Sequence, residues 1–172
     1  MNKQKLHPNS FNFSRFSEQQ AATVLSWIQS ESDRVLWSGN SFIDGLNLLS
    51  FQKHLRREDL LAFQLLDKSK IINGYGEIIL KSKEQATLCR IIVAPRIRGE
   101  GIGKYLCENL ISEIRKLKDI KEVSLNTLTC NKAAMACYKS LGFSNLGIKK
   151  KCRRIGNSWH DLIYMSLQLS NN

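Results

Sequence analysis

The sequence predicts a mixed α/β fold in one domain, residues 1–172, with a sheet of antiparallel and parallel strands flanked by helices. The 172 residues suit one compact domain, and 42% of them are hydrophobic, which is ordinary for a globular protein. Apolar runs of strand length fill the middle of the chain and then alternate with segments of helical period. We find no repeat, low-complexity tract or Gly/Pro/Ser-rich linker that would divide the chain.

The first third of the chain predicts mainly helices. Ser17 followed by Gln20 matches a capping box that opens an amphipathic helix through Ile28. Residues 35–58 show no clear period, so we expect short helices and loops there.

The middle of the chain predicts three consecutive strands. The apolar runs 60–66 and 71–80 flank the polar segment 67–70, which is typical of a β-hairpin. A third strand is expected over 86–93, and Pro95 ends it.

The last part of the chain changes period several times, which predicts alternating helices and strands. Gly142 is expected to end the second of these helices in a left-handed cap. The expected elements are a helix over 101–118, a strand over 122–128, a helix over 131–141, and strands over 143–153 and 159–169.

Composition excludes several classes of protein. No apolar run approaches the ~20 residues that cross a bilayer, and the polar segment 1–10 does not resemble a secretory signal. The five cysteines form no CxxC pair and the three histidines are scattered, which argues against a disulfide framework and a metal site. We therefore expect a cytoplasmic protein with reduced thiols, no metal and no membrane partner.

The net charge of +11 predicts an anionic partner, either nucleic acid or a phosphorylated cofactor. It argues mildly against a strongly cationic substrate such as a polyamine.

The most informative segment is the turn over residues 92–104, which reads IVAPRIRGEGIGK. Its glycines allow backbone amides to approach a ligand closely, and the helix that follows offers unpaired N–H groups and a positive dipole end. Arg96, Arg98 and Lys104 add positive charge, so the turn predicts a pyrophosphate site. Alternatively, the glycines only shape a tight connection between a strand and a helix.

Two other glycine motifs fit the turn poorly. A dinucleotide motif needs a third glycine where Leu106 stands, and a P-loop needs Ser or Thr where Tyr105 stands. Arg98, Gly101 and Gly103 instead match the pattern [Q/R]-x-x-G-x-[G/A], and in this the turn resembles the cofactor motif of the GNAT superfamily of N-acetyltransferases.

A second block strengthens the resemblance. GNAT proteins commonly carry N-x-x-A-x-x-x-Y-x-x-x-G-F at this distance after the first motif, and Asn131, Ala134, Tyr138, Gly142 and Phe143 match every position. On a helix, Asn131 and Tyr138 lie near one face and can face the same cleft.

The resemblance implies a GNAT fold with splayed central strands, with the CoA-binding core over about residues 60–169. It implies an N-acetyltransferase that uses acetyl-CoA as cosubstrate, with direct attack by an amine in a ternary complex. The strand backbone at residues 92 and 93 would pair with the pantetheine, and the turn amides would hold the pyrophosphate. The residues that the resemblance assigns to the cosubstrate are Ile92, Val93, Arg98, Gly99, Glu100, Gly101, Ile102, Gly103, Lys104, Asn131 and Tyr138.

Tyr138 resembles the general acid of the family. A leaving thiol has a pKa of about 8.5 against about 10 for tyrosine, so full proton transfer would be uphill by roughly 2 kcal/mol. A hydrogen bond that strengthens as the thiolate leaves avoids most of this cost. Alternatively, Tyr138 is a buried aromatic with a satisfied hydroxyl. Cys137 has no histidine near it in the sequence, which favours a small core residue over a covalent nucleophile.

The general base is the main departure from the family pattern. Asn126 stands where some amine-acetylating branches carry a glutamate, and an amide cannot take a proton. Glu77 is the best remaining catalytic carboxylate, acting through water, although it also suits an exposed strand position. An α-amine with a pKa near 7.8 is neutral in roughly one molecule in seven at pH 7, whereas lysine, near 10.4, is almost wholly charged. We therefore expect an acceptor of low pKa, either a protein N-terminus or a small amine.

Three residues have two interpretations each. Arg90 points either toward the acceptor or to the other face of the sheet in a salt bridge. Trp37 and Phe42 belong either to acceptor loops or to the core.

The basic run over 149–154, KKKCRR, is the densest charge cluster. It suits RNA, a ribosome surface, anionic lipid or the 3′-phosphate of CoA, but also a solvated edge strand whose lysines prevent pairing with other sheets. The competing functions are thus a non-catalytic basic nucleic-acid-binding module and a GNAT-fold protein that binds CoA without turnover. A homodimer formed through the last strands is a further expectation from the family.

Overall fold

A computed structural model of the chain describes residues 10–42 and 44–170. Most of the N-terminal segment on which the signal-peptide interpretation depended lies outside them. The elements are β1 (Asn12–Arg15), the 3-10 helix η2 (Glu18–Gln20), α1 (Ala21–Ser26), α2 (Glu31–Ser38), α3 (Leu48–Leu55), β2 (Leu60–Leu66), β3 (Ile72–Leu80), β4 (Gln85–Val93), the 3-10 helix η3 (Pro95–Ile97), α4 (Ile102–Arg115), β5 (Glu122–Leu128), α5 (Lys132–Ser140), β6 (Ser144–Ile155) and β7 (Ser158–Gln168).

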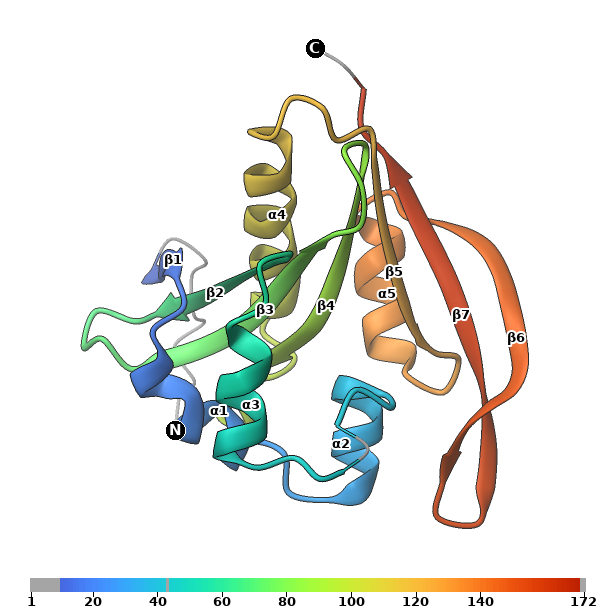
Figure 1. Cartoon of the computed structure of the whole chain (residues 1–172), viewed down its shortest axis with the longest axis horizontal. Helices are drawn as coiled ribbons and strands as arrows, with labels where there is room; N and C mark the ends of the chain where they lie inside the picture. Colours follow the sequence, from blue (N-terminus) through green and yellow to red (C-terminus); the bar gives the residue numbers. More distant parts are fainter. Residues whose placement is uncertain (1–9, 43, 171–172) are drawn as a thin grey trace.

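The described strands form one seven-stranded mixed sheet in the order β1-β2-β3-β4-β5-β7-β6. β4 and β5 are parallel and pair only over residues 85–87 and 122–124. Beyond that point the two strands diverge, and Figure 1 shows the opening between them. This confirms the predicted splayed central strands, and it leaves the outer half of β4 without a partner on that side among the described strands.

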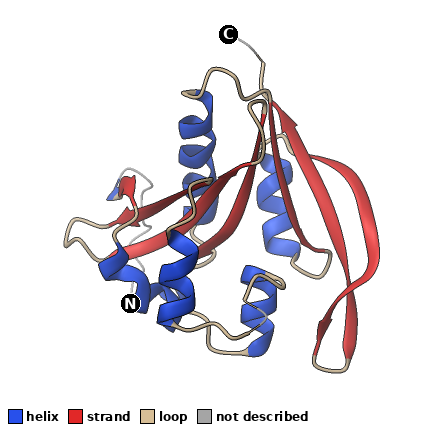
Figure 2. Ribbon diagram, in the orientation of Figure 1, coloured by secondary structure: helices blue, strands red, loops and turns tan. Residues whose placement is uncertain are grey.

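Helices cover both faces of the sheet (Figure 2). α4 approaches β3 very closely, because a Cβ added at Gly76 would lie 2.8 Å from Leu110 Cδ1 of α4. The other face carries an aromatic core in which Tyr75 of β3 meets Phe51 of α3 and Trp37 of α2, with ring centroids 5.6 and 6.2 Å apart. The sheet therefore separates two layers, and the split between β4 and β5 connects them.

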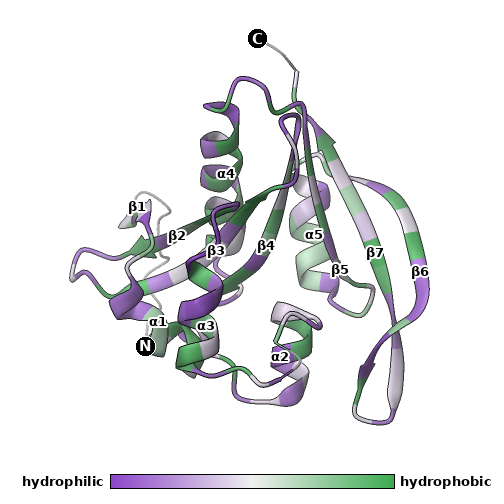
Figure 3. Cartoon of the chain, in the orientation of Figure 1, coloured by the Kyte–Doolittle hydropathy of each residue, from purple (hydrophilic) through white to green (hydrophobic). Residues whose placement is uncertain are grey.

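α4 is amphipathic, as its helical period predicts, and Figure 3 shows its alternating hydrophobic and hydrophilic bands. Ile102, Leu106, Leu110 and Ile114 are buried along one face. Among the described residues, no helix has both the length and the apolarity needed to cross a membrane.

The β2–β3 hairpin is confirmed, and Asp67 organises its turn. Asp67 Oδ1 accepts hydrogen bonds from the amides of Ser69 and Ile71 at 2.9 and 3.0 Å, and Oδ2 accepts one from Asn73 Nδ2 at 3.0 Å. Burial alone would raise the pKa of Asp67, but these hydrogen bonds outweigh it and lower the pKa.

The capping box predicted at Ser17 and Gln20 is wrong. The segment begins as a 3-10 turn, and the Ser17 side chain makes no capping hydrogen bond. A capping box does form at α3, where the Asn47 side chain accepts from the Ser50 amide at 2.9 Å and Ser50 Oγ accepts from the Asn47 amide at 3.0 Å.

The basic run lies on β6, the edge strand of the sheet beyond β7. The run forms a bulge in which Lys151 has φ +46°. Asp161 of β7 holds this bulge, because it accepts from Lys150 Nζ at 2.8 Å and from the Lys151 amide at 2.9 Å.

Candidate functional site

Two cavities meet at the split between β4 and β5. One, here called the α4 cavity, has a volume of about 570 Å³ and lies against the glycine turn, α4 and α5. The other, here called the α2 cavity, has about 590 Å³ and lies between α2 and the strands β4 to β7. The side chains that line both cavities are Leu36, Trp37, Ile91, Asn131, Ala134 and Tyr138. These residues mark the place where a ligand in one cavity can reach a ligand in the other.

The α4 cavity contains most of the residues predicted for a pyrophosphate. Gly99 and Gly101 have φ of +84° and +81°, a left-handed conformation that side chains disfavour. A Cβ at either glycine would meet no protein atom within 4 Å, so the space beside them is open to a ligand. Arg98 and Lys104 line the same cavity.

The N-terminus of α4 supplies unpaired donors to this cavity. Within the described chain, the first backbone hydrogen bond of the helix runs from the Tyr105 amide to the Gly101 carbonyl at 3.1 Å, and the amides of residues 101–104 donate to no protein acceptor. Such amides, at the positive end of the helix dipole, are suited to an anion. The residues present therefore fit a pyrophosphate.

Two of the predicted cosubstrate residues do not line the cavity with their side chains. Ile102 is 1% exposed and packs into the core, and Glu100 lies outside the cavity lining. Only their backbone can contribute to the site.

The outer part of β4 offers an unpaired strand edge to the same cavity. Ile92 and Val93 pair with β3 on one side and face the split on the other. Arg98 Nε donates to the Val93 carbonyl at 3.1 Å, which holds the turn against the end of the strand. This edge is suited to an extended ligand with amide groups such as pantetheine.

Tyr138 stands on α5 where the two cavities join. Asn131 caps this helix, since its side chain accepts from the Ala134 amide at 3.3 Å. The Tyr138 ring packs edge-on against Phe143 at 6.0 Å, and the hydrogen bonds among the described residues do not include its hydroxyl. Burial raises the pKa of Tyr138 well above its ordinary value, so the hydroxyl stays protonated and can donate.

Two cysteines line the α4 cavity, Cys107 of α4 and Cys137 of α5. The neighbouring Cys107 thiol lowers the pKa of Cys137, whereas the same neighbour together with burial raises the pKa of Cys107. Cys107 is buried and Cys137 only partly buried, so Cys137 is also the more accessible thiol and the one expected to react first.

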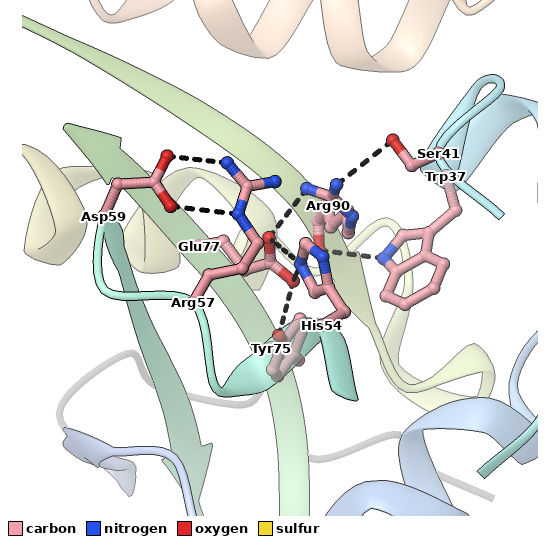
Figure 4. Close-up of polar contacts among 8 residues, drawn as sticks. All are labelled: Trp37, Ser41, His54, Arg57, Asp59, Tyr75, Glu77 and Arg90. Atoms are coloured by element: carbon pink, nitrogen blue, oxygen red, sulfur yellow. Dashed lines mark hydrogen bonds and ion pairs between the residues drawn. The ribbon is translucent and has the colours of Figure 1, made fainter. Parts of the chain in front are cut away.

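Glu77 lies at the centre of a buried polar network, which Figure 4 shows from the aromatic side of the sheet. Its side chain is 0% exposed and accepts from Tyr75 Oη at 2.6 Å, Arg90 Nη1 at 2.7 Å and His54 Nε2 at 3.0 Å. Burial and the Glu77 charge raise the pKa of Tyr75, which keeps it a donor.

This placement argues against the predicted role of Glu77 as general base. A base needs the acceptor amine, or one water, within hydrogen-bond distance. Glu77 does not line the α2 cavity, and three protein donors hold its carboxylate. The alternative interpretation as an exposed strand residue is wrong, because the side chain is completely buried.

Arg90 combines both of its predicted interpretations. It forms the salt bridge to Glu77 and also lines the α2 cavity. It occupies a bulge in β4 with φ +49°, and its carbonyl accepts from Trp37 Nε1 at 2.8 Å, which fastens α2 to the strand. Trp37 is likewise both a core residue, 8% exposed, and a lining residue, whereas Phe42 belongs to the core alone.

Asn126 is exposed and lines the α2 cavity, at the position where a glutamate base was expected. Further back, Thr87 Oγ1 and Ser124 Oγ are hydrogen-bonded at 2.7 Å and close the point from which the strands diverge. The described part of this cavity therefore has hydroxyl, amide and cationic side chains on its walls, but no carboxylate.

The sequence did not point to Lys81, which lines the α2 cavity, or to His54 and Tyr75, which hold Glu77 beside it. Tyr75 could have been found, because residues two apart share one face of a strand. Arg153 belongs to the basic run that the sequence singled out, but its place in the wall of the α2 cavity had no signal in the sequence.

Comparisons with known proteins agree on one family. The family model for the acetyltransferase (GNAT) family matches residues 22–143. The [ribosomal protein bS18]-alanine N-acetyltransferase of Escherichia coli K12 is 32% identical over 114 residues, which is 66% of this chain and 74% of that protein. Two solved structures share the fold. The E. coli ribosomal-protein-S18-alanine N-acetyltransferase aligns with TM-score 0.74 and 24% identity over 93% of this chain and 94% of that one. Spermidine N-acetyltransferase from Vibrio cholerae, in complex with CoA and spermine, aligns with TM-score 0.80 and 16% identity over 93% and 96%.

Proposed function

The chain belongs to the GNAT acetyltransferase family, and on this premise we propose that it transfers an acetyl group from acetyl-CoA to an amine of low pKa. The observation that carries the proposal is the junction of the two cavities at Tyr138. The α4 cavity would hold acetyl-CoA and the α2 cavity the acceptor, so that the amine attacks the thioester directly in a ternary complex.

In this proposal the glycine turn binds the pyrophosphate. The unpaired amides of residues 101–104 would donate to its oxygens, and Arg98 and Lys104 would add charge. The open edge of β4 at Ile92 and Val93 would pair with the pantetheine, which brings the thioester to Tyr138.

Tyr138 would act as the acid by donating a hydrogen bond to the departing sulfur. Full transfer is already uphill by roughly 2 kcal/mol for an ordinary tyrosine. Burial raises the pKa of Tyr138 further, so transfer of the whole proton becomes still less favourable. A hydrogen bond that strengthens as negative charge builds on the sulfur is consistent with this environment.

The acceptor would be an α-amine, either a protein N-terminus or a small molecule. Asn126 cannot accept a proton, and Glu77 does not reach the α2 cavity. An amine that is partly neutral at pH 7 depends least on a base. The relative that is 32% identical is named for acetylation of an alanine of a ribosomal protein, which supports the same class of acceptor.

Ligand binding and turnover test the proposal separately. Saturating acetyl-CoA at about 100 times its Kd adds about 2.7 kcal/mol of stability, or a Tm increase of roughly 5–10 °C, whereas ATP should add little. A thiol-release assay with α-amine peptides, lysine side-chain peptides and spermidine then measures transfer. Stabilisation without release from any amine would indicate a protein that binds CoA without turnover. Turnover on lysine side chains alone would contradict the α-amine acceptor.

A further inference from the structure

The walls of the α2 cavity are unusually one-sided in charge. Four cationic side chains line it, Arg57, Lys81, Arg90 and Arg153. None of its described lining residues is an aspartate or a glutamate. An amine acceptor must therefore enter a cavity whose own charges are all positive.

Two of the four cations are neutralised by partners outside the cavity. Arg90 pairs with the buried Glu77 at 2.7 Å, and Arg57 pairs with Asp59 at 2.6 Å. Figure 4 shows both pairs side by side. Their charges are largely cancelled, so they contribute less to ligand binding than their number suggests.

Arg153 is not neutralised in this way. In the described chain it forms no ion pair, and its Nη1 donates only to the carbonyl and sulfur of Cys152, at 3.2 and 3.3 Å. Its guanidinium extends from β6 to Gly39 at the end of α2. The two are so close that a Cβ added at Gly39 would lie 3.4 Å from Arg153 Nε. It is half-buried there, and Nη2 donates to no described acceptor.

Lys81 is the second cation that forms no ion pair with any residue that the structure describes. It follows the last residue of β3 and is exposed, and only the more distant charge of Asp59, the partner of Arg57, interacts with it. The four cations thus stand against two carboxylates, Asp59 and Glu77, so the cavity keeps a net positive charge.

We propose that the acceptor is a primary amine that also carries an anionic group, a carboxylate or a phosphate, which Arg153 binds while Lys81 adds positive charge to the same cavity. The inference rests on the proposed acetyl transfer and narrows its substrate class. A guanidinium can donate two parallel hydrogen bonds to a carboxylate or phosphate, and a lysine adds a point charge. A polyamine would bring further positive charge to the same walls and would be repelled.

Matched acceptor peptides test the substrate class in the wild-type enzyme. Ala-Asp-Ala-amide, Ala-Asn-Ala-amide and Ala-Lys-Ala-amide share the same α-amine and differ almost only in charge. Charge-assisted hydrogen bonds predict that kcat/KM is about tenfold higher for the Asp peptide than for the Asn peptide, and lowest for the Lys peptide. A second pair, with phosphoserine and serine in the middle, distinguishes phosphate from carboxylate. Equal turnover of the Asp, Asn and phosphoserine peptides, or a preference for Lys, would overturn the inference.

Variants assign the preference to the two residues. Arg153→Gln should reduce the tenfold Asp-over-Asn ratio by about fivefold, and Lys81→Gln, at an exposed site, by about twofold. Lys118→Gln removes the same charge from an exposed lysine outside both cavities and should leave the ratio unchanged. An undiminished ratio in both cavity variants would refute the assignment.

The acetyl-CoA thermal shift serves as the control for folding, because a variant that retains it has an intact α4 cavity. Together with the turnover assays it separates failure of the proposed acetyl transfer from failure of the anionic acceptor. If the wild type acetylates no amine, the proposed function fails. If it acetylates neutral or cationic α-amines best, only the anionic acceptor fails.

Discussion

Replacing Glu77 by alanine should destabilise the protein severely. The carboxylate is 0% exposed, and its partner Arg90 is 6% exposed. Glu77→Ala leaves the Arg90 charge buried without a carboxylate, which costs about 3–5 kcal/mol. Because the free energy of unfolding of a typical domain is about 5–15 kcal/mol, a large part of the stability would be lost. For a chain of this size the Tm should fall by roughly 6–20 °C.

A double-mutant cycle measured by denaturant unfolding checks the cause. Arg90→Met should be costly alone, since it leaves the Glu77 carboxylate with only Tyr75 and His54. The double variant Glu77→Leu/Arg90→Met removes both charges, so it should be much more stable than the sum of the single losses predicts. A Tm for Glu77→Ala within about 2 °C of the wild type would refute the argument from burial.

The same site tests whether Glu77 takes part in chemistry. Glu77→Gln keeps the shape and most of the hydrogen-bonding groups. If Glu77 only stabilises the fold, the folded Glu77→Gln variant should keep the kcat and the pH profile of the wild type. A folded, acetyl-CoA-binding variant that has lost kcat at every pH would return Glu77 to the role of base.

Four further predictions concern other parts of the molecule. Gly101→Ala forces a side chain into φ +81° and should reduce stability by about 1–2 kcal/mol. Gly103→Ala should leave the stability unchanged, because its Cβ would lie an ordinary 3.7 Å from its nearest protein neighbour. The added methyl group should instead raise the KM for acetyl-CoA by about tenfold or more. Iodoacetamide should label Cys137, whose pKa is lowered, faster than Cys107, and acetyl-CoA should slow this labelling, as peptide mass spectrometry would show. Asp67→Ala should reduce the free energy of unfolding at pH 7 by about 1 kcal/mol. Folding lowers the pKa of Asp67, so its contribution is lost as the carboxylate becomes protonated. Denaturant unfolding curves should therefore show a smaller difference between variant and wild type below about pH 4.

The regular elements were predictable because their periods are strong. The strands at 60–66 and 122–128 are β2 and β5 to the residue, and the helix expected over 101–118 is α4 with shorter ends. The left-handed cap at Gly142 is confirmed with φ +91°. β1 was not predicted, because its four residues depend on pairing with β2 rather than on a pattern of their own.

The glycine turn was predictable in the same local sense. Its residues are consecutive, and both the backbone conformation and the helix that follows depend on neighbours in the sequence. The acceptor side depends on long-range contacts. His54 and Glu77 are 23 residues apart, and Arg153 reaches the end of α2 only through the bulge and hairpin of the last two strands. The +49° φ of Arg90 has no signature in the sequence, because glycine or asparagine would normally mark such a position.

The role of Tyr138 at the junction of the two cavities is the central claim, and the kcat of Tyr138→Phe tests it most directly. The variant keeps the ring that packs against Phe143 and removes only the hydroxyl. The assay uses a saturating concentration of an α-amine acceptor that the wild type acetylates. We predict that kcat falls about 100-fold or more, while the Kd for acetyl-CoA stays within about twofold of the wild-type value. A kcat within about threefold of the wild type, with acetyl-CoA binding intact, would contradict the assignment of Tyr138 as the acid.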